Sequence, residues 1–235
     1  MTGSRVNFKT ILAKYQNVNK GNVRLTQSTL FLSKPINPTT TVYNFDVLES
    51  QTQTLEADEI RLNLNDEYTI TQIGFYLQAR VLFRSEAGFT DSGAKVLLTD
   101  TLFGVQASES VKLQPFYDGA FQIAVNNIIY LDKYDTKKSN YTPITQVNAG
   151  GGSATAYTAN FESVDFSKNG LYFCEPMVVL SGAKKNNLQL TLPRAISEAT
   201  FIVNDNNNGV YYLKVDRVVC KFLGLNAQNG ASFQK

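Results

Sequence analysis

The stretch Glu67-Tyr-Thr-Ile-Thr-Gln-Ile-Gly-Phe-Tyr-Leu-Gln-Ala-Arg-Val-Leu-Phe83 decides the fold of this chain. It is rich in the β-branched and aromatic residues that fit a pleated sheet surface, and it is long for a single strand. Its one glycine, Gly74, is where we expect a bulge or a bend. The stretch therefore predicts a long β-structure that is interrupted near Gly74.

Shorter β-type runs, separated by turn residues, occur on both sides of this stretch. We expect strands at 23–33, 41–48, 59–64, 95–99, 111–116, 120–131, 171–180, 187–192, 199–203 and 210–223. Strands and helices do not alternate regularly, which argues against a parallel-sheet enzyme fold. The pattern predicts an all-β fold, an antiparallel β-sandwich of jelly-roll type with a short N-terminal helical arm.

Three loops are expected between these strands, at 85–93, 148–160 and 204–209. The second contains Gly150-Gly-Gly152 and could divide the β-sandwich domain, residues 23–235, into two parts. A long loop within a single sandwich explains the same composition equally well. The third ends in Asn208-Gly209, a hairpin signal because both residues tolerate a positive φ.

The N-terminal segment is basic and amphipathic, with six basic residues and no acidic residue before Asp46. Helical spacing predicts an apolar stripe on one face, formed by Phe8, Ile11, Leu12 and Tyr15. The basic face would be formed by Arg5, Lys9, Lys14 and Lys20. We therefore expect residues 1–22 to form an arm that binds protein through its stripe and presents positive charge elsewhere, although an ordinary exposed basic face is an equal alternative.

Seven acids follow between Asp46 and Glu67. Because Glu59 and Glu67 alternate with apolar residues, we expect both side chains to face solvent. A solvated acidic face of this kind could meet the basic arm of a neighbouring copy. A catalytic carboxylate pair of the glycosidase type is the less favoured alternative.

The composition removes several classes of chemistry, because the chain contains no His and only two cysteines, Cys174 and Cys220. A Ser-His-Asp or Cys-His nucleophile cannot be built from this chain alone, and two separated cysteines make no conventional zinc site. Each cysteine lies in an apolar run, so we expect two buried thiols and not a disulfide.

Two further patterns have simpler explanations as turns. Ser92-x-x-Lys95 and Ser181-x-x-Lys184 match a nucleophile pattern, but its companion motifs are absent. The segment 204–209 resembles the start of a calcium loop, but Val215 stands where the bidentate acid belongs. We therefore predict no enzymatic activity, no cofactor and no metal.

Neither a secretory signal nor a membrane-spanning segment is expected. The N-terminal stretch lacks an uninterrupted apolar core, and no apolar run approaches the roughly 18 residues of a spanning helix. Charged residues make up only 18% of the chain, and Asn, Gln, Thr and Ser supply much of its polarity. Such a composition suits close-packed interfaces better than a highly solvated monomer.

Several strand-and-turn patterns between residues 62 and 193 resemble those of a known family. They are Leu62-x-Leu64-x-Asp66-Glu67-Tyr68-x-Ile70-x-x-Ile73-Gly74-Phe75, Phe116-Tyr-Asp-Gly119-x-Phe-x-Ile-x-Val-Asn-Asn127, Tyr141-x-Pro-x-Thr-Gln146, Glu175-Pro176, Gly182 and Leu188-x-Leu-x-Leu-Pro193. In these the chain resembles the jelly-roll capsid and virion structural proteins of bacteriophages. The resemblance implies a shell subunit that is made in the host cytoplasm and self-assembles into the virion.

The expected partners are copies of the chain itself, in a homo-oligomer such as a trimer, and other virion proteins. The basic arm could also make non-specific contact with packaged nucleic acid or an internal membrane. The alternative function is a carbohydrate-binding or adhesin-like β-sandwich module, with loops rich in Tyr and Asn contacting sugar.

Overall fold

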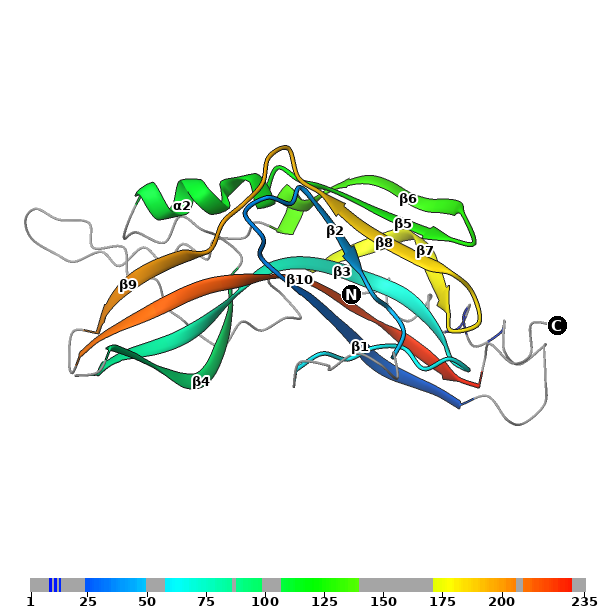
Figure 1. Ribbon diagram of the computed structural model, residues 1–235. Coiled ribbons are helices and arrows are strands. Elements are labelled where there is room, and N and C mark those ends of the chain that lie inside the picture. The colour runs from blue at the N-terminus through cyan, green and yellow to red at the C-terminus, as the bar shows by residue number, and fades with distance from the viewer. Residues whose placement is uncertain are drawn as a thin grey trace, which may run out of the picture.

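The computed structural model describes residues 9, 11, 13, 24–49, 58–85, 88–98, 107–139, 171–205 and 209–229. Strands dominate these residues, and they form two antiparallel sheets that face each other (Figure 1). The larger sheet contains β1 (Arg24–Pro35), β3 (Glu67–Ser85), β4 (Gly88–Leu98), β7 (Tyr172–Ser181), β9 (Ala199–Asp205) and β10 (Gly209–Gln228). The smaller contains β2 (Val42–Phe45), β5 (Ala120–Val125), β6 (Ile128–Asp135) and β8 (Asn186–Thr191), in the order β2-β8-β5-β6. The predicted all-β sandwich is therefore confirmed.

The larger sheet is built on the long antiparallel pair of β3 and β10, which runs from Glu67↔Ala227 to Phe83↔Tyr211. Two shorter strands, β7 and then β4, follow one another along the outer edge of β3. In the same way β1 and β9 share the outer edge of β10. Between β7 and β4, neither strand pairs with Phe75 of β3. The amide N–H of Phe75 instead donates to Ser139 Oγ at 3.1 Å, so a side chain satisfies this backbone group.

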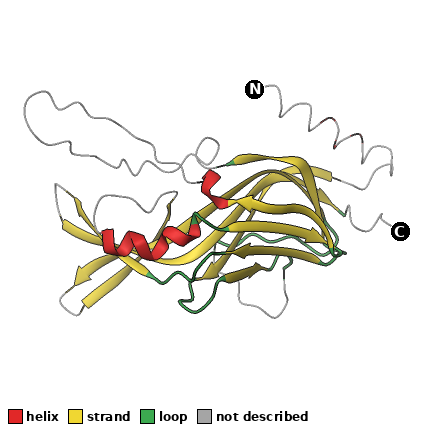
Figure 2. Ribbon diagram, turned by 90° about the horizontal axis from the view of Figure 1, so that it is seen from above, coloured by secondary structure: helices red, strands yellow, loops and turns green. Residues whose placement is uncertain are grey.

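The smaller sheet covers one half of the larger one, and α2 (Ala107–Leu113) lies over the other half beside β9 (Figures 1 and 2). Two short 3-10 helices complete the described elements, η1 (Gln114–Phe116) and η2 (Thr136–Ser139). The core between the sheets centres on Phe121. Its ring centroid lies 4.7 Å from that of Phe75 and 6.3 Å from those of Phe45 and Phe222. These rings come from four different strands, so aromatic packing joins the two sheets.

Two strand predictions and one loop prediction are wrong in detail. The run 120–131 is not one strand, because Asn126 and Asn127 adopt φ values of 50° and 64° and turn the chain between β5 and β6. The run 111–116 is helical, because Leu113 and Phe116 are buried at helical spacing and Val111 is exposed. The expected loop at 85–93 instead contributes most of its later residues to β4.

The interruption expected at Gly74 is also wrong, because Gly74 pairs in register with Lys221. The register of β3 against β10 shifts instead beside Thr71 and beside Asp216. Gly74 has a packing role: a Cβ there would lie 2.5 Å from the Tyr76 hydroxyl oxygen. Gly74 therefore leaves room for the Tyr76 side chain, which lies two residues further along the same strand.

Other sequence expectations agree with the described residues. Cys174 and Cys220 are free and buried. β9 and β10 form the predicted hairpin from Asp205↔Gly209, although residues 206–208 lie outside the described ranges. The loop at 148–160 also lies outside them, but strands from before and after it pair within both sheets. No helix in the described part of the chain is long and apolar enough to cross a membrane.

The central position of Phe121 gives a test of this packing. Phe121 is 0% exposed, whereas Phe89 on β4 is 60% exposed. We expect Phe121→Ala to lower the free energy of unfolding by about 3–5 kcal/mol, because the cavity left among three aromatic rings cannot close fully. Phe89→Ala is the matched control and should cost less than about 1 kcal/mol. Urea denaturation of both variants measures the difference, and equal losses would contradict the assignment of the core.

Candidate functional site

The described residues of the predicted N-terminal arm contact the outer face of the larger sheet. Lys9, Ile11 and Ala13 are helical, and Ile11 is only 5% exposed. Ile11 packs with residues of β1, β7 and β10, namely Leu25, Met177, Leu225 and Ala227. Lys9 is exposed. The other predicted arm residues lie outside the described ranges: Arg5, Phe8, Leu12, Lys14, Tyr15 and Lys20.

Residues 58–62 form a strap that closes one rim of the sandwich. Ile60 exchanges two backbone hydrogen bonds with Phe31 on β1, of 2.9 and 3.0 Å. The amide N–H of Leu62 donates to the carbonyl oxygen of Val47, just after β2, at 2.8 Å. Because β1 and β2 are edge strands of the two sheets, the strap joins the sheets along this rim.

The predicted strand at 59–64 is therefore wrong, since this segment makes only isolated bridges. Its expected apolar face is also wrong. Leu62 is 1% exposed, but Ile60 is 49% and Leu64 is 55% exposed. Apolar and polar residues alternate here in a connecting segment that is not a strand. Of its apolar residues, only Leu62 packs between the two sheets.

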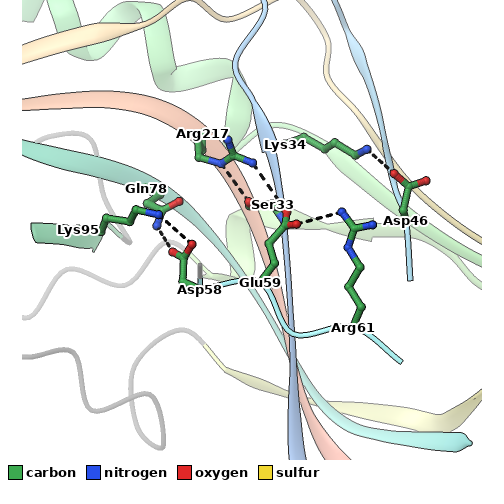
Figure 3. Close-up of polar contacts among 9 residues, drawn as sticks. All are labelled: Ser33, Lys34, Asp46, Asp58, Glu59, Arg61, Gln78, Lys95 and Arg217. Atoms are coloured by element: carbon green, nitrogen blue, oxygen red, sulfur yellow. Dashed lines mark hydrogen bonds and ion pairs between the residues drawn. The ribbon is translucent and has the colours of Figure 1, made fainter. Parts of the chain in front are cut away.

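Glu59 holds the strap to the sheet through buried polar contacts, drawn in Figure 3. Glu59 Oε1 accepts hydrogen bonds from the amide N–H of Ser33 at 3.1 Å and from Ser33 Oγ at 2.8 Å. Glu59 Oε2 pairs with Arg61 at 3.0 Å, and the two side chains are 3% and 5% exposed. Arg217 adds a longer contact of 3.8 Å to Oε1 and donates to Ser33 Oγ. The expectation that Glu59 faces solvent is wrong.

Asp58 makes a second anchor, further across the same face. Its carboxylate accepts from Gln78 Nε2 at 2.5 Å and pairs with Lys95 Nζ at 2.9 Å. Burial alone would raise the pKa of the Asp58 carboxyl, but the hydrogen bonds from Lys95 and Gln78 outweigh burial and lower that pKa. Lys95 of the Ser92-x-x-Lys95 pattern therefore pairs with a carboxylate of the strap.

The remaining acids of this stretch do not combine into a solvated acidic face. Asp46 pairs with Lys34 at 2.6 Å. Asp66 is buried and accepts from the side-chain amide of Asn226 and the backbone N–H of Asn229. Glu67 is 1% exposed, so the prediction that it faces solvent is also wrong. Most of the described acidic side chains of this stretch therefore make contacts within the chain.

This arrangement limits what the carboxylates can do chemically. A glycosidase pair must reach a sugar from both sides of the scissile bond, but Glu59 and Glu67 are both buried. Within the described ranges, no group of three or more acidic or Cys side chains is placed to hold a metal ion. The polar contacts that hold the strap to the sheet are best understood as a structural clasp, formed by Ser33, Glu59, Arg61 and Arg217.

An open cleft of about 590 Å³ lies beside the strap on the outer face of the larger sheet. Its lining mixes apolar and polar side chains, namely Thr29, Phe31, Asp58, Ile60, Gln78, Gly93, Lys95, Leu97 and Lys221. Burial lowers the pKa of the Lys221 ammonium group. The only aromatic ring of the lining belongs to Phe31, which is 8% exposed and so offers little surface for stacking on a ligand.

The opposite rim lies between β6 and β7, the edge strands on that side, and it exposes apolar side chains. Ile128, Ile129 and Tyr130 are consecutive on β6 and are 59%, 54% and 47% exposed. Tyr172 and Phe173, at the start of β7, are 38% and 57% exposed. We call these five residues the open rim. Sequence patterns did not single them out, because a run such as Ile-Ile-Tyr also suits a buried strand.

Comparison of the chain with protein-family models, with curated proteins and with solved structures found no match.

The clasp gives a second testable prediction. Glu59→Gln should lower the free energy of unfolding by about 3 kcal/mol, because it removes the negative charge that the buried Arg61 guanidinium contacts. Asp46→Asn removes an acid from an exposed pair and should cost less than about 1 kcal/mol. Urea denaturation at neutral pH compares the two variants. A Glu59→Gln protein as stable as the control would mean that the strap does not depend on this charge.

Proposed function

We propose that this chain is a structural protein of a bacteriophage virion, and that its copies assemble into the capsid or shell. The observation that carries the proposal is the nested pairing of the strands. β5 pairs with β6, β3 with β7, β2 with β8 and β1 with β10. This is the pairing of one long hairpin with its tip at Asn126-Asn127, rolled into two sheets.

Such nesting supports a jelly-roll assignment, with β4 and β9 as additions that lengthen the larger sheet beyond the smaller one. Jelly rolls occur in viral capsid proteins and in lectins, so the fold alone does not select a function. The low proportion of charged residues and the exposed apolar side chains of the open rim favour assembly over an isolated monomer.

The partners in this proposal are other copies of the chain and other virion proteins. The protein would be made in the host cytoplasm and end in the virion. In the arm, Ile11 would serve as the anchor, because it is buried against the sheet, whereas Lys9 is exposed and available to a negatively charged partner. That partner could be packaged nucleic acid or an internal membrane.

Electron microscopy of the purified protein, together with its mass in solution, tests the proposal. We expect particles, sheets or defined oligomers far above the 26.1 kDa of one chain. A monomer that stays monomeric at high concentration would overturn the proposal. The alternative, a carbohydrate-binding module, would instead appear as a monomer that binds specific sugars on a glycan array.

The arm supplies a third prediction. Deletion of residues 1–20 should prevent assembly while leaving the β-sandwich folded, as judged by circular dichroism and sedimentation. Ile11→Lys should also prevent assembly, because a charge placed against Leu225 and Ala227 would release the arm from the sheet. Ala13→Lys adds the same charge at an exposed helical position and is the matched control. Normal particles from the truncated chain would show that assembly does not need the arm.

A further inference from the structure

One end of the sandwich is built from three loops that are bonded to one another. The amide N–H of Asn126, in the β5–β6 turn, donates to the carbonyl oxygen of Lys185 at 2.8 Å, and the amide N–H of Lys185 donates to Asn126 Oδ1 at 3.0 Å. The amide N–H of Gly182 donates to the carbonyl oxygen of Asp66, and a Cβ at Gly182 would overlap the carbonyl oxygen of Leu64. These loops lie together at the right-hand end of Figure 1. We call this end the tip, formed by residues 63–66, 126–128 and 182–185.

The tip presents positive charge that the described part of the chain does not neutralise. Lys185 is exposed and Lys184 is partly exposed, and neither forms an ion pair with a described acid. Of the described acids near the tip, Asp66 and Glu67 are 5% and 1% exposed, which leaves Glu49 as the exposed one. Other lysines of the described ranges are each paired with an acid, as are Lys34, Lys95, Lys112 and Lys214.

A further basic residue lies at the same end of the larger sheet. A row of paired residues crosses this end from β1 through β10 and β3 to β7, namely Leu25, Ala227, Glu67 and Ser181. Arg24, which is exposed, precedes the first residue of the row, and the turn with Lys184 and Lys185 follows the last. Three strand spacings therefore separate Arg24 from that turn by about 15 Å. Positive charge spread over this width suits a broad anionic surface better than one small anion.

Exposed aliphatic side chains accompany these charges. Leu64 is 55% exposed, and Ile128, directly after the β5–β6 turn, is 59% exposed. An aliphatic side chain is stabilised when it leaves water for hydrocarbon. A nucleic acid presents mainly phosphate and sugar to a basic loop, so it would leave both side chains in water. An anionic lipid surface accepts both kinds of side chain, because its headgroups attract lysines and its acyl boundary accepts aliphatic groups.

We propose that the tip binds an anionic lipid surface. Lys184 and Lys185 contact the phosphate groups of the lipid headgroups, and Arg24 adds charge at the border of the contact. Leu64 and Ile128 enter the boundary between the headgroups and the acyl chains. The inference goes beyond the proposed assembly, because it names a partner that a single copy of the chain also binds.

Sedimentation with lipid vesicles tests the role of the lysines. The full chain should bind vesicles that contain phosphatidylglycerol and phosphatidylcholine, and not vesicles of phosphatidylcholine alone. The double variant Lys184→Gln, Lys185→Gln should bind the anionic vesicles about thirtyfold more weakly, because each basic residue near such a surface strengthens binding about fivefold. The control is Lys133→Gln, Lys137→Gln, which changes two exposed lysines near the other end of β6. Both variants remove two positive charges from a net charge of +2, and the control should bind like the original chain.

The aliphatic residues distinguish a lipid surface from a nucleic acid. The double variant Leu64→Ser, Ile128→Ser should bind anionic vesicles about tenfold more weakly, because it removes the side chains that enter the acyl boundary. Phe89→Ser is the control, since Phe89 is 60% exposed on β4, which pairs with the far end of β3. Suppose instead that the chain binds duplex DNA in a mobility-shift assay, ignores the vesicles and loses DNA binding only in the lysine variant. That result would overturn the lipid proposal.

The outcomes also separate this inference from the proposed function. If the lysine variant binds anionic vesicles as tightly as its control, the tip is not the lipid-binding surface, and the virion proposal still stands. If the original chain stays monomeric but binds those vesicles through Lys184 and Lys185, the tip inference holds and the virion proposal is overturned. Circular dichroism checks that each variant is folded. If the serine variant is not, the lysine variant and its control decide the question.

Discussion

The antiparallel pairing of β3 with β10 is the constraint on which the rest of the structure depends. These two strands are the longest in the described chain, and every other strand of the larger sheet pairs with one of them. Their centres are buried on both faces: Phe75, Tyr76 and Leu77 are 0% exposed, as are Val218 and Val219. A backbone buried in this way must satisfy its hydrogen bonds within the sheet, so flanking strands and Ser139 are required.

The two faces of this central pair are covered by different means. On the inner face, Phe121 and its aromatic neighbours join the pair to the smaller sheet. On the outer face, a smaller apolar cluster of Phe31, Tyr76 and Val219 lies near the strap. The strap brings charges into this region, and Glu59 and Arg61 are tolerated there because each neutralises the other while Ser33 supplies further hydrogen bonds. The burial of the Glu59–Arg61 pair is therefore a consequence of the strap that closes this rim of the sandwich.

Sequence patterns were most informative where a residue's surroundings are set by its own strand. They predicted most of the strands, the hairpin at 204–209 and the burial of the two cysteines. They failed at 59–64, where the spacing of Ile60, Leu62 and Leu64 imitates a strand. The closeness of Glu59 to Arg61 was a usable signal, because residues two apart on an extended chain lie on the same side and can pair. The open rim had no such signal, since exposure depends on what lies beside an edge strand.

By itself, the sequence determined that this chain forms an antiparallel β-sandwich without a His-based catalytic centre. Backbone preference and composition are local properties, and they suffice for those conclusions. Only the tertiary structure decided that β3 pairs with β10, that Glu59 turns inward and that several apolar side chains of β6 and β7 are exposed. The physical reason is that pairing partners, burial and neutralising charges are supplied by residues far apart in the chain. Arg217 and Glu59, for example, meet only because β10 lies beside β1.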